Sequence, residues 1–126
     1  MKMVVIATLL FLLVIAGWLI AYAHVDHVYV ELSNYCSTLA ESLEKQDWDH
    51  ASQQLSMINE QWEKAKKHFN LFMNHEKIHD IELSLARTKQ YIYKKELSLS
   101  LAEIEMLKRL LYMLKEDESL TISNIF

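Results

Sequence analysis

The N-terminal part of the chain is one uninterrupted apolar segment. Residues 3–23 contain no charged side chain, and Leu, Ile, Val and Phe dominate them. As an α-helix, this segment would extend about 31 Å, which matches the hydrocarbon core of a bilayer. Trp18 and Tyr22 stand near its C-terminal end, where amphipathic rings prefer the headgroup region. We therefore expect residues 1–23 to be a membrane anchor that contacts the lipid bilayer through residues 3–23.

The charges on either side of this segment predict its orientation. Lys2 and the amino terminus precede it, whereas Asp26 and Glu31 follow it and the next lysine is Lys45. By the positive-inside rule, the N-terminus lies in the cytoplasm. We expect a single-pass protein of the cell membrane whose bulk, residues 24–126, is extracytoplasmic.

A cleaved signal peptide is the alternative to an anchor. Ala21, Tyr22 and Ala23 fit the small-x-small cleavage pattern, so cleavage after Ala23 stays open. However, the apolar run exceeds the usual signal-peptide core of about 7–15 residues, and no polar region separates it from the cleavage site. We favour the uncleaved anchor.

Beyond residue 23, apolar positions recur with alternating spacings of three and four, which is typical of amphipathic helices. The first stripe is Val25, Val28, Leu32, Tyr35 with Cys36, Leu39 and Leu43. The second and most regular stripe is Trp48, Ala51, Leu55, Ile58, Trp62, Ala65, Phe69 and Phe72. The third is Ile78, Ile81, Leu85, Thr88 and Ile92. The fourth is Leu97, Leu101, Ile104, Leu107 (or Lys108), Leu111 and Leu114, widened by Met106, Leu110 and Met113.

Polar links separate the stripes. Asp47 is a good N-cap for the second helix, and Asn70 and Asn74 mark the next turn. Residues 94–96 are polar but contain no helix breaker, so the third and fourth helices are either separate or continuous. No breaker separates the apolar segment from the first stripe either, so we expect one continuous helix there.

These elements predict an all-α fold, in which an N-terminal transmembrane helix continues into an antiparallel bundle of three to four helices over residues 24–118. Charge supports the pairing. Residues 24–63 contain eight acidic and one basic side chain, whereas residues 64–115 contain eleven basic and six acidic ones. The two halves should attract each other, although exposed ion pairs contribute only tenths of a kcal/mol each.

The last eight residues, 119–126, read as a separate apolar tail. The acidic run at 116–118 is unfavourable at a helix C-terminus, so the fourth helix should fray there. The tail then alternates rather than following a helical period, which permits strand addition to a partner. Three chain reversals place it near the bilayer. We expect Ile122, Ile125 and Phe126 to contact the bundle, the membrane interface or a partner.

Composition excludes several classes of protein. Gly17 is the single glycine and there is no proline, which argues against a β-sandwich, a Rossmann unit or a Gly-rich phosphate loop. Cys36 is the single cysteine, so an intramolecular disulfide or a cysteine-based zinc cluster is excluded. The net charge of −4 argues against nucleic acid as a partner.

One motif points to catalysis. Residues 75–79 match H-E-x-x-H, in which His75 and His79 would bind zinc and Glu76 would act as general base. Lys77 and Asp80 put charges at positions that are usually uncharged in this motif, and nothing predicts a substrate-binding sheet edge. A third ligand could only come from a distant residue such as Glu96 or Glu103. We interpret the motif as a polar helix start and expect no catalytic residue, no metal site and no cofactor, with His75 and His79 as weak metal candidates.

Other side chains have ordinary readings. His24 and His27 lie one turn apart just outside the membrane and could bind metal or sense pH, but a polar collar is the simpler interpretation. Cys36 reads as a small buried hydrophobe, and Trp48 and Trp62 as core anchors.

A basic cluster stands near the end of the second stripe, at Lys64, Lys66 and Lys67. Its simplest interpretation is a solvated helix face. Contact with anionic lipid headgroups is the other possibility.

Several short motifs together carry a resemblance. They are the N-terminal span, Trp48 with Ala51, Trp62, Asn74-His75-Glu76, Ile81-Glu82, Tyr91-Ile92 and the terminal Ser119-Leu120 and Asn124-Ile125-Phe126. In this order they resemble a family of bacterial single-pass membrane proteins, the domain of unknown function four-three-six-three. The resemblance implies an accessory role beside a multi-pass membrane protein and places His75-Glu76 in a helix-turn pattern.

The leading hypothesis is therefore a membrane-anchored interaction or accessory protein that binds a multi-pass membrane protein or an envelope component. The alternative is a helical module that senses a ligand or pH and acts through a membrane partner. A zinc hydrolase is the remote alternative, and we expect no enzyme. A homo-oligomer remains open.

Overall fold

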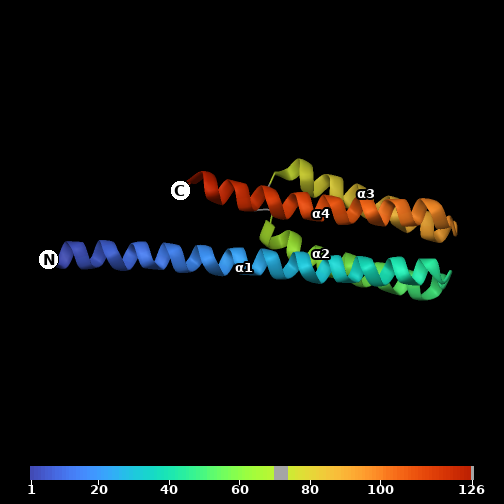
Figure 1. Cartoon of the computed structure of the whole chain (residues 1–126), viewed down its shortest axis with the longest axis horizontal. Helices are drawn as coiled ribbons and strands as arrows, with labels where there is room; N and C mark the ends of the chain where they lie inside the picture. The colour runs from blue at the N-terminus through green and yellow to red at the C-terminus, as the bar shows by residue number, and fades with distance from the viewer. Residues whose placement is uncertain (70–73, 126) are drawn as a thin grey trace.

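The computed structural model describes residues 1–69 and 74–125, with side chains through Asp117. The described residues form four α-helices and no strand: α1 (Lys2–Glu44), α2 (Trp48–Phe69), α3 (His75–Tyr93) and α4 (Leu97–Ile125) (Figure 1). The all-α prediction is confirmed. The third and fourth stripes are separate helices, which answers the question that the polar link had left open.

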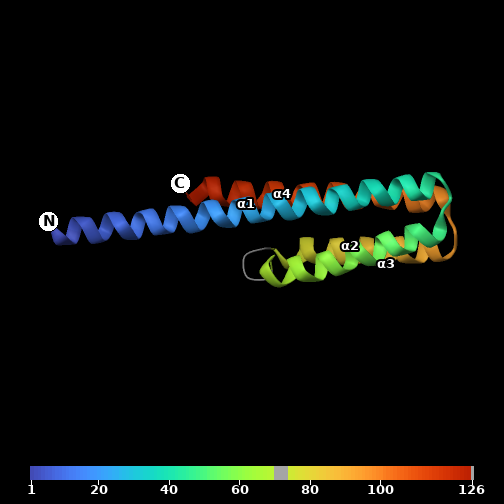
Figure 2. The ribbon, with the colours of Figure 1, turned by 90° about the horizontal axis from the view of Figure 1, so that it is seen from below.

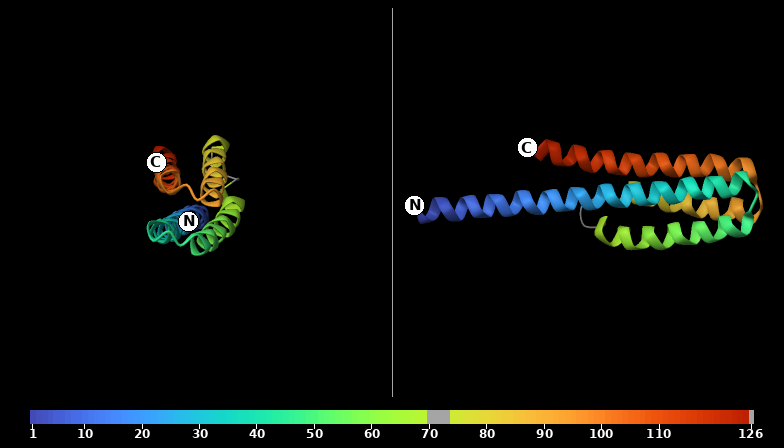
Figure 3. Two further views of the ribbon diagram at one scale, coloured as in Figure 1. Left: turned by 90° about the vertical axis from the view of Figure 1, so that its right-hand side faces the viewer. Right: turned by 60° about the horizontal axis from the view of Figure 1, so that its bottom comes forward.

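The helices alternate in direction to form an antiparallel four-helix bundle. Helix α1 packs against α2 and α4, and α3 packs against the same two helices. The α1–α2 and α3–α4 turns lie together at one end, which we call the distal end (Figure 2). The N-terminal part of α1 projects beyond the opposite end of the bundle, and the last turns of α4 extend past α2 and α3 in the same direction, beside α1 (Figure 3).

Helix α1 continues without a break from the apolar segment into the bundle. It is the one described helix that is long and apolar enough to cross a membrane. Most side chains of its first 24 residues are exposed, whereas Val25, Leu32, Cys36 and Leu39 are buried. The expected continuous helix is confirmed.

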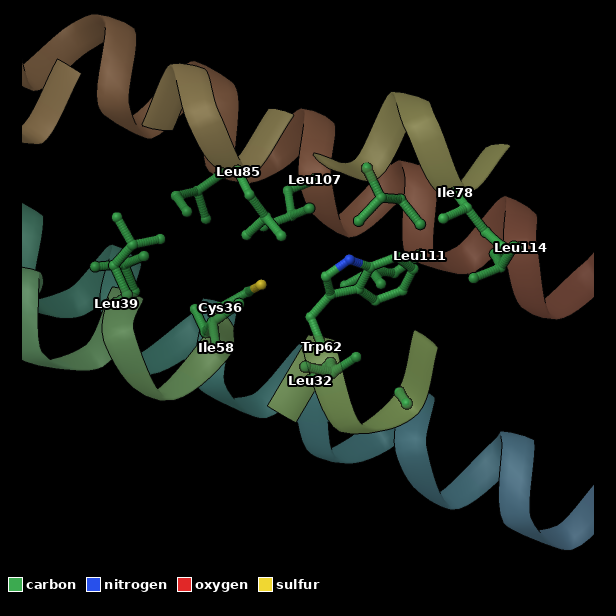
Figure 4. Close-up of a cluster of buried hydrophobic side chains, with 14 of the residues drawn as sticks. Leu32, Cys36, Leu39, Ile58, Trp62, Ile78, Leu85, Leu107, Leu111 and Leu114 are labelled. Atoms are coloured by element: carbon green, nitrogen blue, oxygen red, sulfur yellow. The ribbon is translucent and has the colours of Figure 1, made fainter. Parts of the chain in front are cut away.

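Buried side chains from all four stripes form the core. Trp62 is its largest fully buried side chain and points from α2 toward α3 and α4, near Ile78 and Leu111 (Figure 4). Its ring centroid lies 6.2 Å from that of Phe69. Burial of such side chains stabilises by roughly 1.5–3 kcal/mol each. The alternating spacing therefore identified the faces that the helices bury.

The prediction was wrong at the edges of the fourth stripe. Met106 and Met113 are about half exposed, because α3 and α1 already cover the narrower face of Ile104, Leu107 and Leu111. In the second stripe, Phe72 lies outside the described residues, as does Asn70 in the turn that follows.

Both distal turns use a left-handed residue that is not glycine. Gln46 has φ 54° and Lys95 has φ 56°. After each, a backbone N–H reaches five residues back: Asp47 N donates to Ser42 O at 3.0 Å, and Glu96 N donates to Tyr91 O at 2.9 Å. This Schellman pattern satisfies carbonyls at the ends of α1 and α3 and so stops both helices without a breaker.

The predicted N-cap Asp47 is confirmed, and Asn74, which was predicted to mark a turn, also caps a helix. Asp47 Oδ1 accepts from His50 N at 3.1 Å, and Asn74 Oδ1 accepts from Glu76 N at 3.0 Å. These bonds satisfy free N–H groups at the starts of α2 and α3.

The prediction of a non-helical tail was wrong. Helix α4 continues to Ile125, past the acidic run at 116–118. The acidic run therefore lies two turns before the end of α4. At that distance the negative end of the helix dipole has little effect on the acidic side chains. No glycine or proline interrupts residues 119–125, and adding residues to an existing helix costs little compared with starting one.

Ion pairs between helices give limited support to the predicted attraction of the chain halves. Asp26 on α1 and Lys115 on α4 join the acidic and basic halves at 2.9 Å. The other pairs between helices in the described part join residues of the C-terminal half: Lys66–Glu82 at 2.6 Å, Arg87–Glu103 at 2.9 Å, and Lys77–Asp117. Apolar burial therefore dominates the assembly.

Candidate functional site

A pocket opens between α1 and α2 at the end of the bundle that faces the apolar segment. We call it the histidine pocket. Its volume is about 220 Å³, and it is lined by His24, His27, Val28, Glu31, Leu32, Gln61, Lys64, Ala65 and His68. His24 directly follows the apolar segment, so the pocket begins where α1 would leave a membrane.

Two histidines from different helices meet in this pocket. The ring centroids of His24 and His68 are 5.3 Å apart, and the rings meet edge to face at 76°. Both residues lie 22 positions from Gln46, the left-handed residue of the α1–α2 turn. In an antiparallel helix pair, residues equally far from the turn lie at the same level. His27 lines the same pocket one turn along α1.

The remaining polar groups of the pocket come from both walls. Glu31 stands on α1, and Gln61 and Lys64 stand on α2. Lys64 is exposed, and its Nζ lies 3.5 Å from Oε1 of Glu60 on the same helix. The lining thus presents three imidazoles, one ammonium and one amide as donors, against a single carboxylate.

The other carboxylate in this part of α1, that of Asp26, forms an ion pair outside the pocket. Asp26 Oδ1 lies 2.9 Å from Lys115 Nζ, on the side of α1 that faces α4. This ammonium also stands over the ring of Tyr29, 4.9 Å from its centroid. The hydrogen bond to Asp26 raises the pKa of Lys115, and partial desolvation opposes the rise. The charge of Asp26 is therefore balanced outside the histidine pocket.

The H-E-x-x-H residues occupy the first turns of α3. His75, Glu76 and His79 are exposed, and Asn74 caps the helix through Glu76 N. The structure thus places the motif at a polar helix start, as interpreted from the sequence.

The residues considered as a third zinc ligand lie elsewhere. Glu96 stands beyond the far end of α3, about 30 Å along the helix axis from its first residue. Glu103 is engaged by Arg87, whose Nε and Nη2 lie 3.0 and 2.9 Å from Oε1. Within residues 1–69 and 74–125, no three His, Cys, Asp or Glu side chains are grouped in a way that could hold a metal ion.

The partner-binding candidates lie at or beyond the end of α4. Ile122 and Ile125 belong to its last two turns, but their side chains are outside the described part of the structure. Phe126 lies outside the described residues altogether.

Cys36 and Trp48 lie in or against the core, as interpreted from the sequence, whereas the three clustered lysines are more than a solvated helix face. Cys36 is fully buried, and burial raises the pKa of its thiol to about 12. Trp48 is partly buried against the core. Among the three clustered lysines, Lys66 pairs with Glu82 on α3, whereas Lys64 faces the histidine pocket.

His68 makes the pocket a site between two helices, and the sequence patterns did not predict its part in it. His24 and His27 are paired by their closeness in sequence. His68 lies 44 positions after His24, and the signal that pairs them is their equal distance from the turn at Gln46. This equal spacing predicts that His24 and His68 meet only when Gln46 is known to be the turn residue.

Comparison with known proteins identifies one family. A family model described as a domain of unknown function, DUF4363, matches residues 19–125. No curated protein and no solved structure matches the chain. The matched range begins near the end of the apolar segment and includes every residue of the histidine pocket.

Proposed function

Because the chain belongs to the DUF4363 family, whose description names no activity, we propose a function from the structure itself. The protein is a single-pass membrane protein with a cytoplasmic N-terminus and an extracytoplasmic helical bundle. The bundle binds a multi-pass membrane protein and acts as its accessory subunit. No catalytic step is part of this proposal.

The observation that carries the proposal is the continuity of α1. One helix of 43 residues joins an exposed apolar half to the buried seam of the bundle. A rigid connection fixes both the height and the rotation of the bundle above a bilayer. An enzyme can work on a flexible tether, whereas a fixed pose suits side-by-side contact with another membrane protein.

The outer face of α4 supports such a contact. Leu99, Met106 and Met113 are each about half exposed, and they recur every seven residues along one face. A seven-residue apolar repeat is typical of a seam against another helix. Methionine also adapts to irregular partner surfaces. The partner that fits is an apolar helical surface on the extracytoplasmic side of a multi-pass protein.

Membrane topology is tested first. A reporter fused after Phe126 should be active only outside the cytoplasm, and the full-length protein should stay with membranes after a carbonate wash. An active cytoplasmic reporter contradicts the orientation. Recovery of a mature chain that begins at His24 contradicts the anchor.

Partner contact is tested by photo-crosslinking in living cells. A photoreactive residue in place of Met106 should give one defined adduct with a multi-pass membrane protein. The same residue in place of Lys89, which is exposed on α3, is the matched control and should give none. Adducts of equal yield from both positions contradict a specific face, and an adduct of twice the chain mass assigns a homo-oligomer instead.

A second function, the sensing of a ligand or pH, is favoured by the contact between His24 and His68. This contact lies where the α1–α2 pair reaches the apolar segment, so a change of charge there could alter the spacing of the two helices. The matched test is the double variant His24→Gln/His68→Gln. Loss of a pH response in the partner complex, with crosslinking at Met106 retained, supports sensing.

A further inference from the structure

The histidine pocket stands at the level of lipid headgroups if α1 anchors the chain. The headgroup layer adds roughly 5–8 Å on each side of the hydrocarbon core. His27 lies three residues after His24, which is about 4.5 Å along a helix axis. Both imidazoles, and His68 at the same level as His24, therefore fall within this layer. The chemical groups that surround the pocket in this layer are the zwitterionic and anionic headgroups of the lipids.

The chemistry of the lining favours an anion. Imidazolium, ammonium and amide groups all donate hydrogen bonds, and phosphate oxygens accept them. His24 and His68 are close enough to repel each other when both are protonated, and an anion bound beside both rings offsets that repulsion. Lys64, one turn before His68, adds a further positive charge, which Glu60 at 3.5 Å on the same helix balances only in part because both side chains are exposed.

A metal cation fits this lining less well. No group of three metal-ligating side chains is present among the described residues, and the Lys64 ammonium would oppose a bound cation. Glu31 is the one carboxylate of the lining, and it stands on α1 about two turns beyond His24, on the side away from the membrane. The negative charge of Glu31 therefore repels a headgroup phosphate less than it would if Glu31 stood at the end of the pocket that faces the membrane.

We propose that the histidine pocket binds a phosphate group, and that the headgroup of an anionic phospholipid in the outer leaflet supplies it. The contacts are the adjacent rings of His24 and His68, which present their N–H groups to the same phosphate, with His27 and Lys64 as further donors. The proposal rests on the anchoring of α1. Occupation of the pocket holds the α1–α2 pair at a set depth in the interface.

Binding should strengthen as pH falls, because imidazole changes charge between about pH 5 and 8. The charged groups around the two imidazoles come from three helices. Asp26, His27 and Glu31 lie on α1. Lys64, its partner Glu60 and Lys67 lie on α2, and Lys115 lies on α4 against Asp26.

The test uses the full-length protein in nanodiscs of phosphatidylcholine, with or without about 30 % phosphatidylglycerol. Thermal unfolding is followed by circular dichroism at pH values of about 6 and about 7.5. Phosphatidylglycerol should raise the midpoint by about 3 °C or more at the lower pH, and by less at the higher pH. Inorganic phosphate added to discs without phosphatidylglycerol forms a separate arm. A shift of the same size in that arm assigns the site to free phosphate.

The variant His24→Gln/His68→Gln should lose most of the phosphatidylglycerol shift. His75→Gln/His79→Gln is the matched control, since it removes two exposed histidines from the same end of the bundle, and it should keep the shift. Lys64→Gln is a third variant that leaves the imidazole pair intact. It should halve the shift or more, and it keeps the test decisive if the double variant does not fold.

Besides an equal shift with free phosphate, three outcomes overturn the proposal. Equal shifts in all variants indicate a general effect of membrane charge. No shift with either phosphatidylglycerol or phosphate indicates that the pocket binds no phosphate. A shift produced by zinc alone, and lost in His24→Gln/His68→Gln, assigns a metal site instead. Failure of the anchor is seen separately, because the protein would then elute apart from the nanodiscs before any midpoint is measured.

Discussion

Lys115 of α4 and Asp26 of α1 form an ion pair in which Nζ lies 2.9 Å from Oδ1. Asp26 is the third residue after the apolar segment, and Lys115 stands ten residues before the end of α4. One turn farther from the segment, the rings of Tyr29 and Tyr112 pack edge to face at 6.2 Å. These two contacts set the register of α1 and α4 at the end of the bundle that we place at the membrane.

The first prediction concerns this ion pair. Asp26→Asn should lower the free energy of unfolding by less than about 1 kcal/mol, because both side chains keep partial contact with water. In a double-mutant cycle with Lys115→Met, the coupling energy between the two side chains should account for most of that loss. Equal effects of Asp26→Asn with and without Lys115 would contradict a direct pair.

The pH dependence of the pair has a definite sign. The hydrogen bond to Asp26 raises the pKa of Lys115 above its ordinary value of 10.5. The folded state therefore holds this proton more tightly than the unfolded state does. The stabilisation is complete below pH 10.5 and is lost as pH rises through the folded-state pKa. The difference in stability between wild type and Asp26→Asn should be constant at neutral pH and shrink in strong alkali.

The second prediction concerns Trp62. Trp62→Ala should destabilise the protein by about 3–5 kcal/mol, because the ring is 1 % exposed and its removal leaves a cavity between α2, α3 and α4. Trp48→Ala is the control, and it should cost less because Trp48 is only partly buried. Chemical denaturation followed by circular dichroism measures both. A cost below about 0.5 kcal/mol for Trp62 would show that the ring is not part of the core.

The third prediction concerns Cys36. Burial raises the pKa of its thiol from 9.0 to about 12, and Lys108 only partly opposes the rise. The shift alone reduces the thiolate population about a thousandfold, so iodoacetamide should leave the folded protein unmodified near neutral pH. Modification should become rapid in denaturant, as measured by mass spectrometry. Above pH 9 the unfolded chain loses this proton first, so the group should then disfavour the folded state.

The fourth prediction concerns the H-E-x-x-H residues. The purified protein should contain no stoichiometric zinc, and a chelator should not change the unfolding midpoint of wild type or of His75→Ala. The reason is that His75 and His79 are exposed and lack a third ligand among the described residues. One zinc per chain, lost in His75→Ala, would restore a metal site. Peptidase activity that Glu76→Gln abolishes would be required for an enzyme.

Local periodicity predicted the parts of the fold that depend on neighbours in sequence. Spacings of three and four found the buried faces of all four helices, and Asp47 and Asn74 marked two helix starts. The separation of α3 from α4 was not predictable in this way, because it depends on a left-handed conformation at Lys95 that no glycine announces.

The histidine pocket and the end of α4 depend on long-range geometry. His68 meets His24 only because both stand 22 positions from Gln46. The alternating pattern of residues 119–125 suggested an extended chain, yet these residues are helical because adding them to the existing helix α4 costs little. Alternation over so few residues is weak evidence when a stable helix precedes it.

The fifth prediction concerns the end of α4. The register set by Asp26 and Lys115 places residues 119–125 level with residues 16–22 of α1, and the ribbon shows this part of α4 beside α1 (Figure 3). Trp18 lies in that stretch. Its indole nitrogen is buried, although most neighbouring side chains of α1 are exposed. Tyr22 of α1 stacks on Trp18, with ring centroids 6.3 Å apart. We expect the last turns of α4 to lie at the membrane interface beside this pair rather than to hold the bundle together.

Deletion of residues 119–126 tests this role. The truncated protein should keep its helical bundle, with an unfolding midpoint within about 2 °C of wild type, because the described core ends at Leu114. The indole N–H signal of Trp18, followed by NMR, should shift and exchange faster, whereas the signal of Trp62 should not change. Crosslinking to the membrane partner should weaken, since Ile122, Ile125 and Phe126 are removed. Loss of folding would make these residues part of the core, and an unchanged Trp18 signal with unchanged crosslinking would leave them without the proposed role.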